Sequence, residues 1–99
     1  MSPEEILQAE GIVLPTPSPA VANYVRAVRV GSLVFVSGHG PFVDGKPAHV
    51  GKLGSQLTVE EGRQAAEQVT INILATLKAE LGELSKVKRI VKLLVMVNA

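Results

Sequence analysis

Hydrophobic residues follow a helical period in the second half of the chain. Residues 58–61 read Thr-Val-Glu-Glu, a capping box in which the Thr and a Glu three positions later each bond the other's backbone N–H. This pattern predicts a long helix from there to about Leu81, with Gly82 as its C-cap. Its apolar residues recur at steps of three and four and define one face: Ala65, Ala66, Val69, Ile73, Leu77 and Leu81.

A shorter helix is predicted at the start of the chain. Residues 2–5, Ser-Pro-Glu-Glu, form a second capping box with proline at the first helical position, and Gly11 ends the helix. Residues 14–19 contain three prolines and favour an extended connector, with a proline-motif ligand for another protein as the alternative. We therefore separate a helical and Pro-rich lead-in at residues 1–22 from a single domain over residues 23–99.

A β-hairpin is predicted between these two helices. Residues 24–30 and 33–37 are rich in β-forming side chains and are separated by two residues. The first of the two is Gly31, which supplies the positive φ that a two-residue turn needs. A second turn at residues 44–47 precedes a short predicted strand around residues 49–50.

The last predicted strand covers residues 87–97 and completes an α+β domain with the long helix packed on one sheet face. Residues 33–36 are apolar at every position, and residues 93–97 are apolar on both faces. One helix covers one face only, so we expect a second copy of the sheet to cover the other and the protein to be a homo-oligomer. The terminal strand has no turn, partner strand or polar tail after it, as expected of a chain cut short.

Composition and charge exclude several classes of function. Aromatic residues make up 3% of the chain, so the core must be aliphatic. The chain has no Cys, which removes disulfides, thiolate metal sites and thiol catalysis and fits a reducing cytosol. A net charge of +1 argues against a non-specific nucleic-acid binder. With an acidic N-terminus and no apolar stretch long enough to span a bilayer, we expect a cytoplasmic protein with no membrane partner.

The side chains at the end of the second strand are the first candidates for chemistry. Ser37 and His39 are two positions apart, with Asp44 nearby, but the G-x-S-x-G pattern of a nucleophile elbow is absent. A hydrogen-bonding or turn role for Ser37 is therefore favoured over nucleophilic catalysis. His39 and His49 are the two histidines, and neither has a carboxylate at helical or hairpin spacing, so no metal site is predicted.

Other polar motifs have simpler interpretations. Glu60 and Glu61 cap the long helix and complement its dipole. Gly38-x-Gly40 is too short for a dinucleotide fingerprint, and no cofactor is predicted. Tyr24 opens the first strand and either packs as an amphipathic side chain or lines a site. A basic cluster is read as a solvated strand edge, with RNA contact as the alternative: Lys86, Lys88, Arg89 and Lys92.

Taken in order along the chain, these motifs resemble the RidA family, also called YjgF or endoribonuclease L-PSP. The resemblance rests on the hairpin at residues 23–41, on the long helix from Leu57 to Gly82, and on the strand entry at residues 84–92. It implies a chorismate-mutase-like α+β fold with a mixed sheet, incomplete at the C-terminus of this chain. It also implies a homotrimer with sheets facing inward and helices outside.

Characterised members of this family hydrolyse 2-imino or 2-amino-enoic acids to ammonia and a 2-oxo acid without metal or organic cofactor. The resemblance implies that Tyr24 lines the pocket and that Ser37 and the Gly38 backbone help to fix the substrate. His39 stands where the family usually has Gln, which leaves its contribution to substrate binding open.

The chain departs from the family pattern in one respect that bears on catalysis. The family's carboxylate-binding Arg and water-orienting Glu lie on strands beyond Ala99, so the catalytic residues are not assigned here. From the motifs that do match, the resemblance implies an imine or enamine deaminase acting at subunit interfaces. A non-catalytic trimer that binds small ligands is the alternative, and an endoribonuclease is a third.

Overall fold

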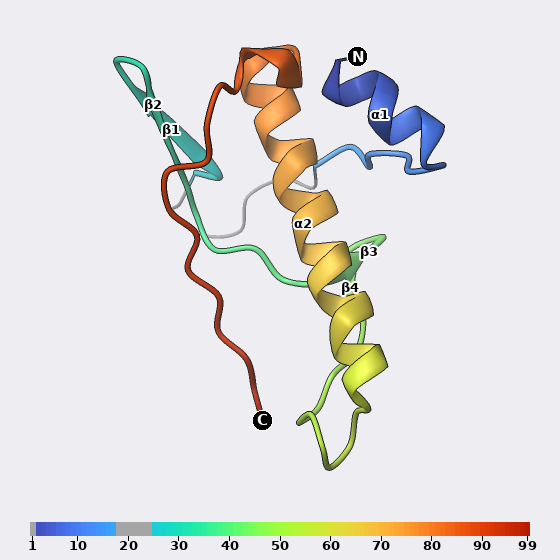
Figure 1. Cartoon of the computed structure of the whole chain (residues 1–99). Coiled ribbons are helices and arrows are strands. Elements are labelled where there is room, and N and C mark those ends of the chain that lie inside the picture. The colour runs from blue at the N-terminus through green and yellow to red at the C-terminus, as the bar shows by residue number, and fades with distance from the viewer. Residues whose placement is uncertain (1, 18–24) are drawn as a thin grey trace.

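A computed structural model describes residues 2–17 and 25–99 (Figure 1). The hairpin and the N-terminal helix lie on opposite sides of the long helix in this view, and residues 87–99 pass the lower end of the hairpin and continue toward the N-terminal end of the long helix. The elements in chain order are α1 (Pro3–Ala9), β1 (Ala27–Val30), β2 (Leu33–Val36), β3 (Phe42–Val43), β4 (Lys46–Pro47), α2 (Val59–Leu81) and the 3₁₀ helix η1 (Leu84–Lys86). The α+β prediction is confirmed.

The capping signals define the long helix α2 as predicted. Thr58 and Glu61 bond each other's backbone N–H groups at its start, and Gly82 ends it with a φ of +88°. Leu77 and Leu81 of the predicted face are buried, whereas Ala66 is exposed and was wrongly assigned to that face. Among the described residues, the buried apolar side chains gather at the C-terminal end of α2 and on η1: Ala75, Leu77, Leu81 and Leu84.

The hairpin β1–β2 forms at the predicted turn. Val30 pairs with Leu33 and Val28 with Phe35, and Gly31 has a φ of +59°. These four strand residues share one face, because directly opposed residues of an antiparallel pair point the same way. These residues are 47–60% exposed. Both faces of the hairpin were expected to be covered, but the described part of this chain leaves this face uncovered.

The second hairpin differs from the prediction by a few residues. Asp44 and Gly45 both have positive φ, +51° and +79°, as a type I′ turn requires, so the returning strand begins at once as β4. The strand predicted around residues 49–50 is not observed. His49 has a φ of +57°, a left-handed conformation that cannot continue a strand.

Residues 87–99 form no strand, contrary to the prediction. A strand needs a neighbour for its backbone N–H and C=O groups, and the periodicity of side chains does not supply one. Hydrogen bonds from this segment to the loop before α2 lie near residue 99. There the Leu53 N–H donates to the Asn98 carbonyl at 2.9 Å, and the Asn98 side-chain amide donates to the Gly51 carbonyl at 3.3 Å. The apolar side chains of residues 90–97 remain exposed.

Helix α1 is anchored to the end of α2 by one of its acidic residues. Ser2 and Glu5 form the predicted capping box. A carboxylate oxygen of Glu4 accepts the backbone N–H of Leu84 at 2.7 Å, which satisfies a donor at the start of η1. This hydrogen bond to the charged form lowers the pKa of Glu4.

Acid should therefore weaken the attachment of α1. Because the folded-state pKa of Glu4 is depressed, its stabilising contribution is present above its ordinary pKa and is lost as pH falls through the folded value. Glu4→Gln keeps a neutral acceptor but removes the charge. The melting temperature of Glu4→Gln should lie below wild type at about pH 6 and approach it at about pH 3. Glu10→Gln, at the exposed end of the same helix, is the matched control, and an equal effect of both substitutions would contradict the assignment.

Candidate functional site

The end of strand β2 is held to the neighbouring strand by two hydrogen bonds of Ser37. Its backbone N–H donates to the Arg26 carbonyl at 2.8 Å, continuing the ladder beyond the last paired strand residues. Its hydroxyl donates to the Val25 carbonyl. Since a hydroxyl has one proton and two lone pairs, the Ser37 Oγ faces any ligand as a hydrogen-bond acceptor.

Both ring nitrogens of His39 are occupied within the chain. Nδ1 lies 2.7 Å from the Ser37 carbonyl oxygen, and Nε2 lies 2.8 Å from the Thr76 hydroxyl oxygen. A carbonyl oxygen can only accept, so Nδ1 must carry a proton. In the neutral ring Nε2 is then the acceptor, and the Thr76 hydroxyl donates to it.

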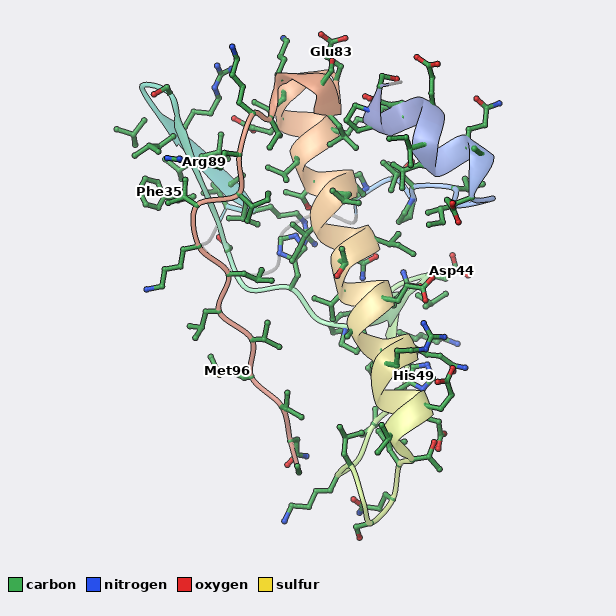
Figure 2. All side chains as sticks on the ribbon, viewed as in Figure 1. Phe35, Asp44, His49, Glu83, Arg89 and Met96 are labelled. Atoms are coloured by element: carbon green, nitrogen blue, oxygen red, sulfur yellow. The ribbon has the colours of Figure 1, made fainter. Side chains whose placement is uncertain are left out.

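These contacts do not assemble a nucleophilic triad. The imidazole of His39 contacts the carbonyl of Ser37 and not its hydroxyl, so it is not placed to remove the hydroxyl proton. Asp44 lies in the turn between β3 and β4 (Figure 2), and neither ring nitrogen of His39 bonds to it. The geometry agrees with the favoured sequence interpretation, in which Ser37 has a hydrogen-bonding role.

Helix α2 also holds the loop that follows the strand. The Asn72 carboxamide donates to the carbonyl oxygens of Gly40 and Phe42, at 2.9 and 3.0 Å. Gln68 donates to the Asn72 side-chain oxygen at 3.0 Å and so fixes which way the carboxamide points. Sequence reasoning missed these residues and Thr76. The available signal was their spacing of four, which places Gln68, Asn72 and Thr76 on one side of α2.

Gly38 is the open position of this strand end. It is exposed, and a Cβ built on it would meet no atom within 4 Å. Its backbone N–H has no hydrogen-bond partner among the described residues. Within the described residues, the strand end therefore presents an unpaired donor, the Gly38 N–H, one residue after an acceptor, the Ser37 Oγ. Tyr24, the remaining predicted site residue, lies outside the described residues.

Two hollows of the described surface lie away from this strand end. One, of about 240 Å³, lies between the second hairpin and α2, and His49 is among its lining residues. The other, of about 530 Å³, lies between the N-terminal segment and α2, beside Lys78. Neither is lined by Ser37, Gly38 or His39, so both hollows lie apart from the predicted site.

The ion pairs of the described region lie on its surface. Arg63 bonds Glu60 at 2.8 Å and Glu67 at 3.0 Å on the exposed side of α2, and these carboxylates raise its pKa.

Within residues 2–17 and 25–99, no three His or acidic side chains are grouped closely enough to hold a metal ion, and no helix is long and apolar enough to cross a membrane. The basic cluster of the C-terminal segment is exposed: Lys86, Lys88, Arg89 and Lys92.

Several known proteins are similar to this chain in sequence and fold. Residues 4–99 match the family described as "YjgF/chorismate mutase-like, putative endoribonuclease". A crystal structure of a "putative endoribonuclease" from Shewanella oneidensis MR-1 is 41% identical, with a TM-score of 0.85. That of the protein Atu1372 from Agrobacterium tumefaciens, described as of unknown function, is 40% identical, with a TM-score of 0.79. Protein TCP17 of Trypanosoma cruzi is 42% identical over 93 residues.

These relatives are longer than the chain. The match covers 94% of the chain and 58% of TCP17. For the two crystal structures it covers 91% and 89% of the chain, but 60% and 54% of theirs. The chain thus spans between half and two thirds of the length of the proteins that it matches.

Proposed function

Because this chain belongs to the YjgF/chorismate mutase-like family, we propose that it contributes to a site that hydrolyses 2-imino and 2-amino-enoic acids. A 2-amino-enoic acid first becomes the imine by moving a proton from nitrogen to carbon. Water adds to the C=N carbon of the imine, the C–N bond then breaks, and ammonia and a 2-oxo acid leave. The observation that carries the proposal is the strand end after β2. There Gly38 is exposed with an N–H that has no hydrogen-bond partner among the described residues, and the hydroxyl of the preceding residue, Ser37, donates to the Val25 carbonyl.

The two groups suit an imino acid chemically. A substrate carboxylate or the attacking water needs a donor, which the Gly38 N–H supplies. The nitrogen of the imine or of the departing amine carries N–H groups, which the Ser37 Oγ can accept because its own proton is held by the Val25 carbonyl. Tyr24 is proposed from the family resemblance to complete the pocket wall.

The apolar face of the hairpin supports a homotrimer with the site between subunits. This face consists of Val28, Val30, Leu33 and Phe35, and the Phe35 ring points away from α2 in Figure 2. Contiguous exposed apolar surface of this kind is typical of an interaction site. A neighbouring subunit on it would border the strand end and add its own side chains to the site. Light scattering on the full-length protein should give the trimer mass, and a stable monomer would contradict the proposal.

Ser37→Ala should lower kcat/KM about tenfold, the effect of losing one hydrogen bond of ordinary net strength. The assay uses the full-length protein: an amino-acid oxidase generates the imino acid in situ, and its disappearance is followed with and without the protein. Ser55→Ala, in an exposed loop, is the matched control and should keep the wild-type rate.

The two possible failures of this assay have different meanings. If the assembled full-length protein does not accelerate loss of the imino acid, the deaminase proposal is wrong. If the wild-type protein is active and Ser37→Ala is equally active, Ser37 is removed from the site while the activity stands. Tyr24→Phe, measured alongside, tests the proposed pocket wall in the same way.

A non-catalytic trimer that binds small ligands is the second candidate. It is favoured by the chemistry of the strand end, where no charged side chain hydrogen-bonds to Ser37, Gly38 or His39 within the described residues. Calorimetric binding of a 2-oxo acid without turnover of the imine would support it. An endoribonuclease, the description given to the Shewanella structure, fits less well with a net charge of +1.

A further inference from the structure

Three polar side chains of α2 lie in a row on the side that faces the loop after β2. Gln68, Asn72 and Thr76 follow one another at intervals of four residues, which places them one turn apart on one side of the helix. Thr76 is 4% exposed and lies among the buried apolar residues of α2. A hydroxyl in such a place needs a partner, and the ring of His39 provides it at 2.8 Å.

The row contacts the loop at two separate points. Asn72 donates to the carbonyls of Gly40 and Phe42, beyond the strand end. Thr76 bonds to His39, which in turn bonds to the Ser37 carbonyl, inside the strand end. The exposed position Gly38 lies between Ser37 and His39, so the residues on both sides of it are held by the Thr76 contact, and the Asn72 contact holds the loop just beyond them.

We propose that Asn72 and Thr76 form a two-point clamp on residues 37–42, and that His39 is a positioning residue that transmits the Thr76 contact to the Ser37 carbonyl. The N–H of Gly38 and the Ser37 Oγ are thereby kept in one orientation. His39 cannot also bind substrate through its ring nitrogens, because both are used. The clamp rests on hydrogen bonds of the described residues, and its effect on turnover rests on the proposed function.

The arrangement imposes one proton position on the neutral imidazole. The carbonyl of Ser37 requires the proton on Nδ1, and the Thr76 hydroxyl then donates to Nε2. In water a neutral histidine side chain is not held to one tautomer by such partners. The tautomer of His39 is therefore a direct readout of the clamp, independent of any enzymatic activity.

Nitrogen NMR of the wild-type full-length protein is the first measurement. His39 should show a protonated Nδ1 and an unprotonated Nε2 when neutral, whereas a neutral ring protonated on Nε2 would overturn the proposal. Thr76→Val removes the hydroxyl but keeps the branched shape. Without the Thr76 anchor the imidazole is free to turn away from the Ser37 carbonyl, so this variant should mix the two tautomers. It should also speed amide hydrogen exchange of Ser37 and Phe42, whose N–H groups bond the Arg26 and Gly40 carbonyls, about tenfold, the change expected for one lost hydrogen bond. Unchanged tautomer and exchange in this variant would also overturn the proposal.

Two further variants separate positioning from general loss of stability. Thr76→Ser keeps the hydroxyl and should restore the wild-type tautomer, although it removes a methyl group from the core. Thr70→Val is the matched control, since the exposed Thr70 hydroxyl bonds to the Ala66 carbonyl of its own helix and not to residues 37–42. A serine variant that behaves like the valine variant would contradict the clamp. Asn72→Ala should loosen Gly40 without altering the tautomer of His39.

The kinetic readout links the clamp to the proposed reaction. If the protein is a deaminase, Thr76→Val should raise KM about fivefold, with kcat within a factor of about two, because a loosened loop weakens substrate positioning. An unchanged KM beside an altered tautomer would remove the functional part of the proposal. If the wild-type protein shows no deaminase activity, the NMR and exchange measurements still decide whether the clamp exists, so the two proposals fail separately.

Discussion

Leu84→Ala is expected to lower the free energy of unfolding by about 3 kcal/mol, within the range for removing a buried leucine side chain. Leu84 is 3% exposed and belongs to the small apolar cluster at the end of α2. Its backbone N–H also donates to a carboxylate oxygen of Glu4 in helix α1. A cavity at this position would therefore loosen α1, η1 and α2 together, since all three meet at this residue.

Urea unfolding followed by circular dichroism measures this change, provided that the slope of the transition stays constant. Val59→Ala is the matched control: Val59 is 80% exposed at the start of α2, and its truncation should alter stability by no more than about 0.5 kcal/mol. A loss below about 1 kcal/mol in Leu84→Ala would mean that the cluster is not the core of the fold.

The fold could be predicted from the sequence wherever a local signal determines the structure. Capping boxes, a C-cap glycine and a two-residue turn act through neighbouring residues. Thr58 and Gly82 accordingly cap the long helix as predicted, and Gly31 has the positive φ predicted for the turn. The prediction of a strand at residues 87–97 failed because a strand depends on a partner elsewhere in the chain and not on local signals alone. The side chains of this segment have the right pattern, but a strand also needs a partner for its backbone, and the described residues offer none along its length.

The candidate site was predictable in part. Ser37 and Gly38 follow an apolar strand and stop it, and this marks the strand end in the sequence. The clamp from α2 was missed because periodicity separates apolar from polar residues and assigns the polar ones to solvent. Thr76 is 4% exposed, and its partner His39 is 37 residues away. A pairing at that distance follows from how α2 packs on the loop, which no local pattern specifies.

Gly62→Ala is expected to destabilise the chain even though alanine favours helices. A Cβ on Gly62 would lie 2.7 and 2.8 Å from the two methyl carbons of Leu53, closer than carbon atoms can approach. The backbone of Leu53 is held, because its N–H is bonded to Asn98 and its segment is bridged to Leu57, so only a change of its side-chain rotamer would relieve the contact. Overpacking costs about 1–3 kcal/mol, whereas the helix propensity of alanine returns up to about 1 kcal/mol, so the net loss should be about 1–2 kcal/mol.

The same substitution should change sign once Leu53 is truncated. In a Leu53→Ala background the methyl groups are gone, the steric cost disappears, and Gly62→Ala should stabilise the chain by up to about 1 kcal/mol through helix propensity alone. Chemical denaturation of the two single variants and the double variant measures this coupling. If Gly62→Ala were stabilising in both backgrounds, Leu53 would be free to move aside. The segment before α2 would then not be held against the helix by close packing at Gly62.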